Sequence, residues 1–175
     1  MNRSKLISVF CIFFLFQGFN SLKTQTEQKE PINIHIVPHS HDDAGWLYTA
    51  DEYYTGNNCE YISVKNILDD MVISLYNDPT RTFVYAEMFF FEKWFSALDE
   101  ETKQKVRNLV TQKRLEFVNG GWVMNDEATV NYQHVIDQMR LGLRFLKREF
   151  NFYPTTAWYI DPFGHSATNV KIILI

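Results

Sequence analysis

Short apolar segments alternate along this chain with longer segments in which apolar residues recur every three or four positions. The apolar runs of strand type are 32–37, 82–86, 115–118 and 157–160. The segments of helical period are 61–76, 88–97, 99–113 and 132–150. Strands that alternate with helices in this way are typical of a parallel sheet covered by helices, so the sequence predicts an α/β fold.

A polar cluster follows each of the predicted strands. The clusters are HSHDDAGW (39–46), Glu87, NGGWVMNDEA (119–128) and DPFGHS (161–166). The carboxyl ends of parallel strands lie at one edge of a sheet, where α/β proteins bind their ligands. We therefore expect the four clusters to converge on one site.

The first cluster predicts a site for a divalent metal ion. Imidazole nitrogen and carboxylate oxygen together suit zinc. Residues two apart in an extended segment point the same way, so either His41 with Asp43 or His39 with His41 could share one ion. The alternative is a loop that enters a helix, with an aspartate as its cap and a buried histidine.

The last cluster places Asp161 at the end of a predicted strand and before a proline. Proline restricts the residue before it to an extended conformation, which fixes the direction of the carboxylate. The alternative is an aspartate that begins a turn. For Asp126 and Glu127 in the third cluster, capping of the helix that begins near Tyr132 is favoured over contact with a substrate.

Aromatic residues close to these carboxylates indicate a sugar ligand. Trp46, Phe163 and Trp122 could cover the C–H face of a pyranose while carboxylates accept hydrogen bonds from its hydroxyls. The alternative for each ring is a place in the hydrophobic core.

The charge of the chain excludes some classes of partner. It has 17 basic and 21 acidic residues, a net charge of −4, and no block of Lys or Arg. Nucleic acids and anionic membrane surfaces are bound mainly through basic clusters, so neither is expected as a partner. A small or neutral molecule is expected instead.

The first residues have the pattern of a signal peptide. Two basic residues precede an apolar run from Leu6 to Phe16, which is shorter than the roughly 20 residues of a membrane-spanning helix. We predict a signal peptide at 1–21, a polar linker at 22–31 and the folded domain at 32–175, with a membrane anchor as the alternative to the signal. Cys11 would leave with the signal, so Cys59 would have no internal disulfide partner.

Five segments in order resemble one enzyme family. They are HIVPHSHDDAGWL, DPTRTFVYAEMFFFEKWF, RLEFVNGGWVMNDEA, DQMRLGLRFL and WYIDPFGHS. Together they resemble the amino-terminal part of the catalytic domain of the glycoside hydrolase family 38 α-mannosidases, most of all the lysosomal class. The resemblance implies about half of a seven-stranded β/α barrel, in a protein of the lysosome or the extracellular space.

The resemblance also implies a function and a site. The family contains zinc-dependent, retaining enzymes that remove terminal non-reducing α-D-mannose from N-glycan oligosaccharides. By this likeness His41 and Asp43 would bind zinc, and Asp161 would be both a zinc ligand and the catalytic nucleophile. Trp46 and Phe163 would line the pocket for mannose, and His39 would not be a ligand.

The sequence departs from the family in ways that leave other functions open. The fourth zinc ligand of the family, a histidine, and its acid/base aspartate lie beyond the last residue here, so we expect an incomplete catalytic domain with little activity. We also expect ATNVKIILI, after Ser166, not to continue the helix of the family. The alternatives are a non-catalytic sugar-binding or structural remnant and an amidohydrolase-like metal hydrolase that uses His39 and His41.

Overall fold

The computed structural model describes residues 31–57 and 63–173, and the chain divides into two compact units, 1–35 and 36–175. The fold described below is that of the second unit. The predicted signal peptide, all of the predicted linker except Pro31, and Cys59 lie outside the described residues. Within the described residues, no helix combines the length and the apolar character needed to cross a membrane.

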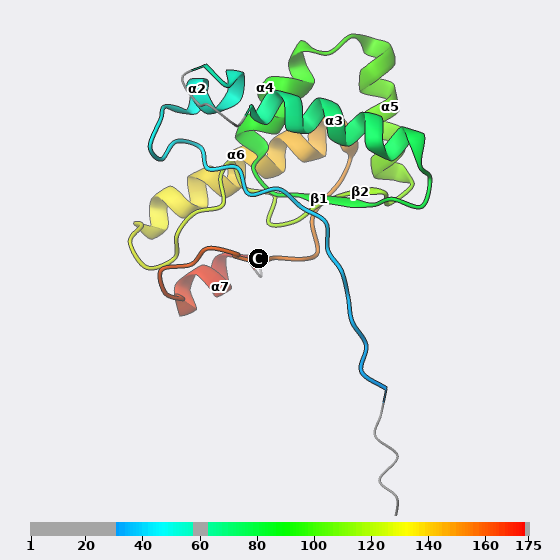
Figure 1. Cartoon of the computed structure of the whole chain (residues 1–175). Helices are drawn as coiled ribbons and strands as arrows, with labels where there is room; N and C mark the ends of the chain where they lie inside the picture. Colours follow the sequence, from blue (N-terminus) through cyan, green and yellow to red (C-terminus); the bar gives the residue numbers. More distant parts are fainter. Residues whose placement is uncertain (1–30, 58–62, 174–175) are drawn as a thin grey trace, which may run out of the picture. The chain divides into compact units, whose positions relative to one another are not determined.

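Two parallel strands and six helices form the described part of the second unit. Strand β1 (Phe83–Tyr85) pairs with β2 (Leu115–Phe117), with Phe83 opposite Leu115. The helices are α2 (Ala50–Thr55), α3 (Val64–Asn77), α4 (Met88–Ala97), α5 (Glu100–Thr111), α6 (Tyr132–Phe150) and α7 (Ala167–Ile173). In the view of Figure 1, α3, α4 and α5 lie above the strands and α7 lies below them. The predicted α/β class is confirmed.

The predicted strands at 32–37 and 157–160 are wrong as strands, although the chain beside each one flanks the sheet. His39 forms an isolated parallel bridge with Val84, whose N–H donates to the carbonyl of Pro38 at 2.9 Å. On the other side the N–H of Asn119 donates to the carbonyl of Thr156 at 2.9 Å. A strand needs a ladder of consecutive backbone hydrogen bonds. Each flank instead makes an isolated contact, in the order that the sequence predicts.

The predicted helices are confirmed, and two more are present. The segments 88–97 and 132–150 are helical over the predicted ranges. The predicted helices at 61–76 and 99–113 correspond to α3 and α5, although residues 61–62 lie outside the described residues. Helix α2 was not predicted, although Thr49 and Glu52 form a complete capping box at its start. The expectation that no helix follows Ser166 is wrong. The hydroxyl of Ser166 accepts hydrogen bonds from the N–H groups of Thr168 (3.2 Å) and Asn169 (3.4 Å), which caps α7.

Phenylalanine rings fill the core between the sheet and the helices. Phe91 of α4 is fully buried, and its ring lies 4.9 Å from that of Phe117 in β2 and 6.2 Å from that of Phe145 in α6. One face of α4 therefore packs against both the sheet and α6. Burial of aromatic rings on this scale supplies much of the stability of a domain of this size.

A glycine brings α6 close to the loop that follows β2. A Cβ atom at Gly142 would lie 2.1 Å from the carbonyl oxygen of Gly120, so only glycine permits this approach. Gly120 has a φ of 77°, in the left-handed region. The loop after β2 thus turns directly on the surface of α6, and this contact places Asp126 and Glu127.

Candidate functional site

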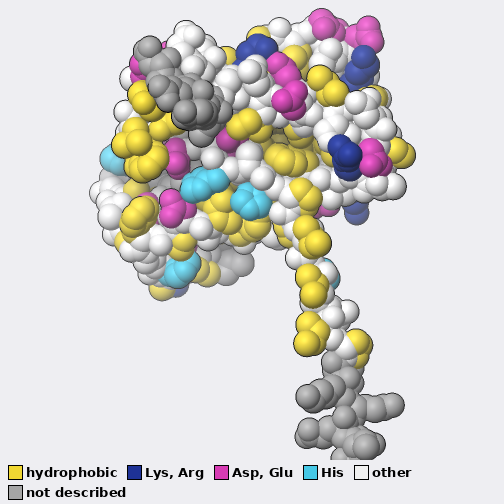
Figure 2. All heavy atoms as spheres, in the orientation of Figure 1, with side chains coloured by type: hydrophobic (Ala, Val, Ile, Leu, Met, Phe, Trp, Pro, Cys, Tyr) yellow, Lys and Arg dark blue, Asp and Glu magenta, His cyan; other side chains and the backbone are white. Residues whose placement is uncertain are grey.

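His41 lies between two carboxylates that come from different ends of the chain. Its Nε2 is 3.3 Å from Oδ1 of Asp43 and 3.9 Å from Oδ2 of Asp161. His41 and Asp161 follow the two segments that flank the sheet. In a flat sheet of four strands, the ends of the two outer strands would be about 14 Å apart. The loops after these segments instead bring His41 and Asp161 close together. Figure 2 shows histidine and acidic side chains gathered on one face of the molecule.

His41, Asp43 and Asp161 fit zinc in donor type, and the two distances from His41 fit the spacing between zinc ligands. Two ligands that each lie about 2.1 Å from a tetrahedral zinc ion are about 3.4 Å apart. The two distances from His41, 3.3 and 3.9 Å, are close to that value. Among the described residues, however, no group of three or more His, Cys, Asp or Glu side chains is arranged to hold a metal ion. The fit is therefore that of a partial ligand set around His41.

The ring of His39 has different surroundings. It packs edge-on against Trp158, with ring centroids 4.8 Å apart, and its Nδ1 lies 3.1 Å from the carbonyl of Ser40. Of the two pairs that the residue spacing allows, the structure brings His41 and Asp43 together. This arrangement gives no support to a metal site shared by His39 and His41.

Three buried ionisable groups lie in or next to the loop 39–46. Asp42 is 4% exposed and accepts a hydrogen bond from the hydroxyl of Ser40 at 2.8 Å, while Tyr85 and Glu87 are almost completely buried. Burial raises the pKa of Asp42. Burial, and then the charge of Asp42, raise the pKa of Glu87 to about 8, so Glu87 is protonated at neutral pH.

The buried role of Asp42 was not predicted from the sequence. The only available signal was its position between two candidate ligands, because neighbours in an extended segment point to opposite faces. His41 and Asp43 point outward, so Asp42 points inward.

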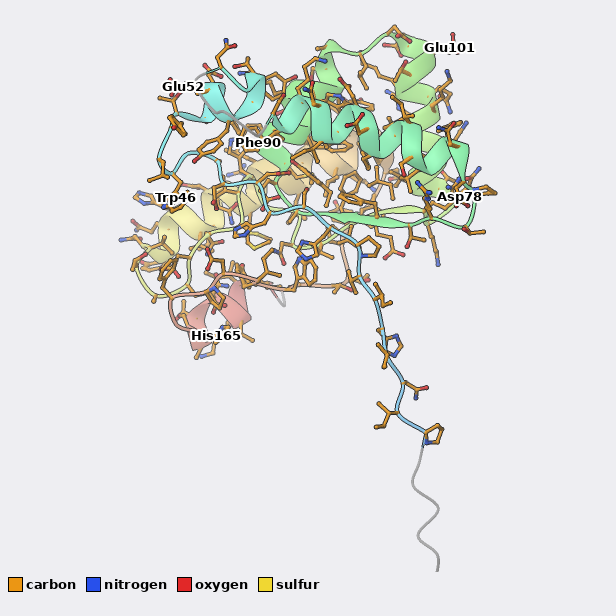
Figure 3. The ribbon with its side chains drawn as sticks, viewed as in Figure 1. Trp46, Glu52, Asp78, Phe90, Glu101 and His165 are labelled. Atoms are coloured by element: carbon orange, nitrogen blue, oxygen red, sulfur yellow. The ribbon has the colours of Figure 1, made fainter. Side chains whose placement is uncertain are left out.

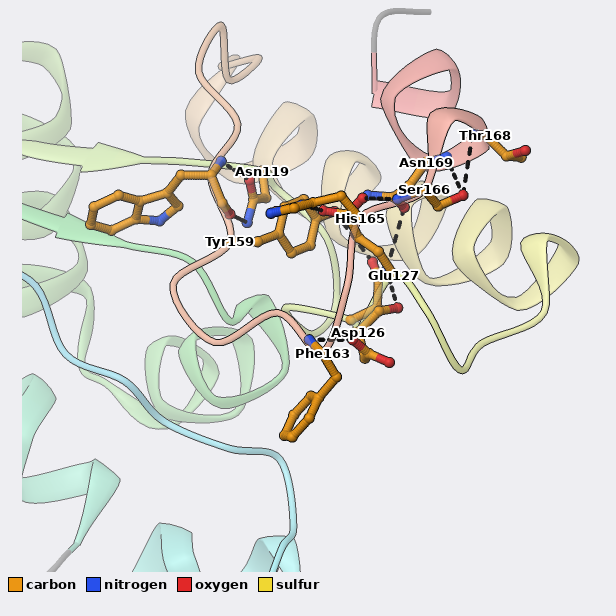
Figure 4. Close-up of polar contacts among 11 residues, drawn as sticks. Asn119, Asp126, Glu127, Tyr159, Phe163, His165, Ser166, Thr168 and Asn169 are labelled. Atoms are coloured by element: carbon orange, nitrogen blue, oxygen red, sulfur yellow. Dashed lines mark hydrogen bonds and ion pairs between the residues drawn. The ribbon is translucent and has the colours of Figure 1, made fainter.

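The third and fourth clusters are joined by hydrogen bonds, which are drawn in Figure 4. Oδ1 of Asp126 accepts from the N–H of Phe163 at 3.1 Å. Oε2 of Glu127 accepts from the N–H of Ser166 at 2.8 Å, and Oε1 lies 2.9 Å from Nδ1 of His165. These two acidic residues were expected to cap the helix near Tyr132, and that prediction is wrong.

The cap of α6 is Asn131, whose side chain accepts from the N–H of Gln133 at 2.9 Å. Asp126 instead accepts from the hydroxyl and the N–H of Thr129 as well as from Phe163. These hydrogen bonds, that of the Thr129 hydroxyl above all, lower the pKa of Asp126 to about 2. Asp126 is therefore ionised at any pH at which the chain would work.

The two aromatic residues predicted to bind sugar are exposed. Trp46 is 74% exposed and Phe163 is 76% exposed, and Figure 3 shows Trp46 on the loop that precedes α2. Phe163 is two residues after Asp161, on the same loop. Trp122 packs against Phe89 at 5.7 Å and belongs to the margin of the core, which was the alternative for that ring.

Comparisons with known proteins identify the family of the chain. Residues 31–173 match the model of the glycosyl hydrolases family 38 N-terminal domain. Mouse lysosomal alpha-mannosidase is 55% identical over 145 residues, which are 81% of this chain and 14% of the relative. The alpha-mannosidase of Canavalia ensiformis is 53% identical over 140 residues, which are 79% of this chain and 14% of the relative.

Human lysosomal alpha-mannosidase is 50% identical over 151 residues, which are 84% of this chain and 15% of the relative. The chain thus spans only 14 or 15% of the length of these three curated relatives. The resemblance found in the five sequence segments is confirmed. The chain belongs to glycosyl hydrolase family 38, whose N-terminal domain it matches from residue 31 to residue 173.

Proposed function

We propose that this chain forms the amino-terminal part of the catalytic domain of a retaining α-mannosidase. The substrates would be mannose-containing oligosaccharides, from which terminal non-reducing α-D-mannose is removed. The observation that supports this proposal is the position of His41 between Asp43 and Asp161. The names of the relatives, which are alpha-mannosidases, support the class of substrate.

Asp161 is the proposed nucleophile. Its side chain is 58% exposed, so a sugar could reach it. In a retaining mechanism, a carboxylate oxygen of Asp161 would attack the anomeric carbon while the glycosidic C–O bond breaks and its electron pair passes to the leaving oxygen. Water would then hydrolyse the covalent glycosyl ester and release mannose.

His41, Asp43 and Asp161 are the proposed ligands of a zinc ion. Bound zinc would supply positive charge that orients sugar hydroxyls and keeps nearby carboxylates ionised. His41 would hold Asp43 and Asp161 in place on either side of its Nε2. Trp46 and Phe163 would cover the apolar face of the mannose ring.

A retaining enzyme also needs a carboxylic acid about 5 Å from the nucleophile to protonate the leaving oxygen. Three acidic residues near the site do not fit that role. Asp126 is ionised, and both carboxylate oxygens of Glu127 have partners. Glu87 is protonated but only 2% exposed. We therefore expect this chain by itself to hydrolyse ordinary mannosides very poorly.

A second candidate function is sugar binding without turnover. The exposed rings of Trp46 and Phe163 favour it, because they could bind a pyranose without a proton donor. For either function we propose the secretory pathway, with the lysosome or the extracellular space as destination and no nucleic-acid or membrane partner after signal cleavage. The apolar run at 6–16 and the lysosomal relatives support this location.

A zinc titration of the purified chain tests the metal site. Calorimetry should show zinc binding of modest affinity, and His41→Ala should weaken it by about tenfold or more, because it removes the ligand between the two carboxylates. His134→Ala, an exposed histidine on α6, is the matched control and should bind as the unaltered chain does. Tight binding that survives His41→Ala would contradict the assignment.

A further inference from the structure

Asp126 and Glu127 have no part in the proposed reaction, yet both contact the loop that carries its nucleophile. They are neighbours in the loop between β2 and α6, and their partners lie 37 to 39 residues later in the chain. Figure 4 shows the two acidic side chains side by side against the segment 163–166. A contact of this length in sequence fixes tertiary structure rather than a local turn.

Glu127 makes the more buried of the two contacts. The residue is 7% exposed, and each of its carboxylate oxygens has a separate partner, the N–H of Ser166 and Nδ1 of His165. A buried carboxylate is costly unless it is fully hydrogen-bonded, and hydrogen bonds to an ionised group are the stronger ones. Glu127 therefore stabilises one conformation of the loop end at 165–166.

Asp126 holds the same loop closer to the nucleophile. Its Oδ1 binds the N–H of Phe163, which is two residues after Asp161, and its Oδ2 binds the N–H of Thr129 at 2.9 Å. One side chain thus ties the Asp161 loop to the loop after β2. Together with Glu127 it fixes the backbone at two points on the carboxyl side of Asp161.

The loop after β2 is itself attached to a long helix. The backbone carbonyl of Gln138 in α6 accepts a hydrogen bond from the N–H of Trp122 at 3.0 Å, and its side-chain Oε1 accepts one from the N–H of Val123 at 3.1 Å. Its Nε2 donates to Oδ1 of Asn125 at 2.8 Å. The acidic pair therefore connects a rigid element, α6, to an exposed loop.

We propose that Glu127, assisted by Asp126, is a positioning residue that holds the Asp161 loop so that the Asp161 carboxylate faces His41. This inference rests on the proposed function, because it assigns a purpose to the placement of Asp161. Neither residue acts on substrate, since the oxygens that would do so are bound to the loop. A loop displaced by even 1 Å would separate Asp161 from His41 and from a bound sugar.

Hydrogen exchange tests the attachment without any ligand. In Glu127→Gln the amide of Ser166 should exchange about tenfold faster or more, while the amides of β1 and β2 keep their rates. A general loss of stability would accelerate both sets, so the difference between them reports on the loop alone. The control is Glu101→Gln, which removes the same charge on α5 from an exposed ion pair with Lys105.

Co²⁺ titration, followed by visible absorption, tests the consequence for the site. Loss of an outer residue that orients a ligand typically lowers metal affinity by about 10- to 100-fold. We expect such a loss in Glu127→Gln, a smaller one in Asp126→Asn, and none in Glu101→Gln. If Glu127→Gln does not fold, Asp126→Asn carries both measurements, because it leaves the buried carboxylate in place.

The results separate this inference from the proposed function. Faster exchange at 163–166 together with weaker Co²⁺ binding supports the positioning role. Unchanged exchange rates, or Co²⁺ affinity equal to that of Glu101→Gln, overturn it. If the unaltered chain binds no Co²⁺, the proposed metal site is contradicted, and the exchange rates alone then decide whether Glu127 holds the loop.

Discussion

The aromatic core and the candidate site are held together by different kinds of contact. Around Phe91, rings from α4, β2 and α6 are buried and pack against one another. Around Asp161, which is itself exposed, the backbone is fixed by single hydrogen bonds that Phe163 N–H donates to Asp126 and Ser166 N–H donates to Glu127. Packing energy is spread over many atoms, whereas each hydrogen bond can be lost separately. A substitution in the core should therefore lower the stability of the whole domain, whereas a substitution at the site should remove a single contact.

The largest expected effect is the loss of a core ring. Phe91→Ala should lower the free energy of unfolding by about 3–5 kcal/mol, because it leaves a cavity among packed aromatic rings. Urea unfolding followed by circular dichroism measures this change. Phe163→Ala is the matched control, since the same atoms are removed from a ring that is 76% exposed, and should change stability by less than about 0.5 kcal/mol. Equal losses in the two variants would show that the core is not where the stability lies.

The sequence could predict the parts of the fold that depend on local periodicity. The ranges of α4 and α6 follow from the spacing of their apolar residues, and both are confirmed. The segments 32–37 and 157–160 have strand composition but not strand structure, because a strand depends on a neighbour's hydrogen bonds as well as on its own residues. Helix α7 was missed because ATNVKIILI was judged by its departure from the family, whereas the local signal for the helix is the cap at Ser166.

The same distinction holds within the site. His41 and Asp43 are two residues apart, and their proximity could be predicted from an extended backbone. The contacts of Asp126 and Glu127 span 37 residues or more, so no local pattern could show them. The roles of His41, Asp43 and Asp161 as zinc ligands, and of Asp161 as nucleophile, stay predictions.

The second prediction concerns pH and the buried carboxyl group at the border between core and site. The pKa of Glu87 is raised from 4.5 to about 8, so between these values the unfolded chain loses a proton that the folded chain keeps. The contribution of Glu87 to the free energy of unfolding should therefore be largest below pH 4.5 and fall by a few kcal/mol as the pH rises to about 8, where the change ends. Asp42, whose pKa is also raised, acts in the same direction.

Glu87→Gln isolates the contribution of Glu87. Glutamine resembles the protonated acid, so the variant should unfold at a similar urea concentration at pH 5 and show a smaller difference between pH 5 and pH 8 than the unaltered chain. Glu116→Gln, at an exposed position on β2, should keep the full difference. A pH dependence that is unchanged in Glu87→Gln would mean that another group is responsible.

The third prediction concerns the close contact between Gly142 of α6 and Gly120 in the loop after β2. Gly142→Ala places a methyl group 2.1 Å from the carbonyl of Gly120, a backbone atom that cannot rotate away. We expect a loss of about 1–3 kcal/mol and weaker zinc binding, because the loop that bears Asp126 and Glu127 must shift. Leu141→Ala, which truncates an exposed neighbour on the same helix, should affect neither quantity by as much. A Gly142→Ala chain with full stability and unchanged zinc affinity would show that α6 does not position the loop.

The smallest effect on stability is expected at the residue with the largest proposed effect on function. Asp161→Asn changes one exposed oxygen to an amide nitrogen and should alter the free energy of unfolding by less than about 0.5 kcal/mol. The same variant should abolish any hydrolysis of an aryl α-mannoside, a substrate whose activated leaving group needs little protonation. This is the most sensitive assay here, since loss of general-acid help typically costs about 10²- to 10⁴-fold on ordinary substrates. We expect at most a trace of aryl-mannoside hydrolysis by the unaltered chain and no turnover of oligomannose. Robust oligomannose hydrolysis would mean that another residue supplies the proton, and activity that persists in Asp161→Asn would remove Asp161 from the mechanism.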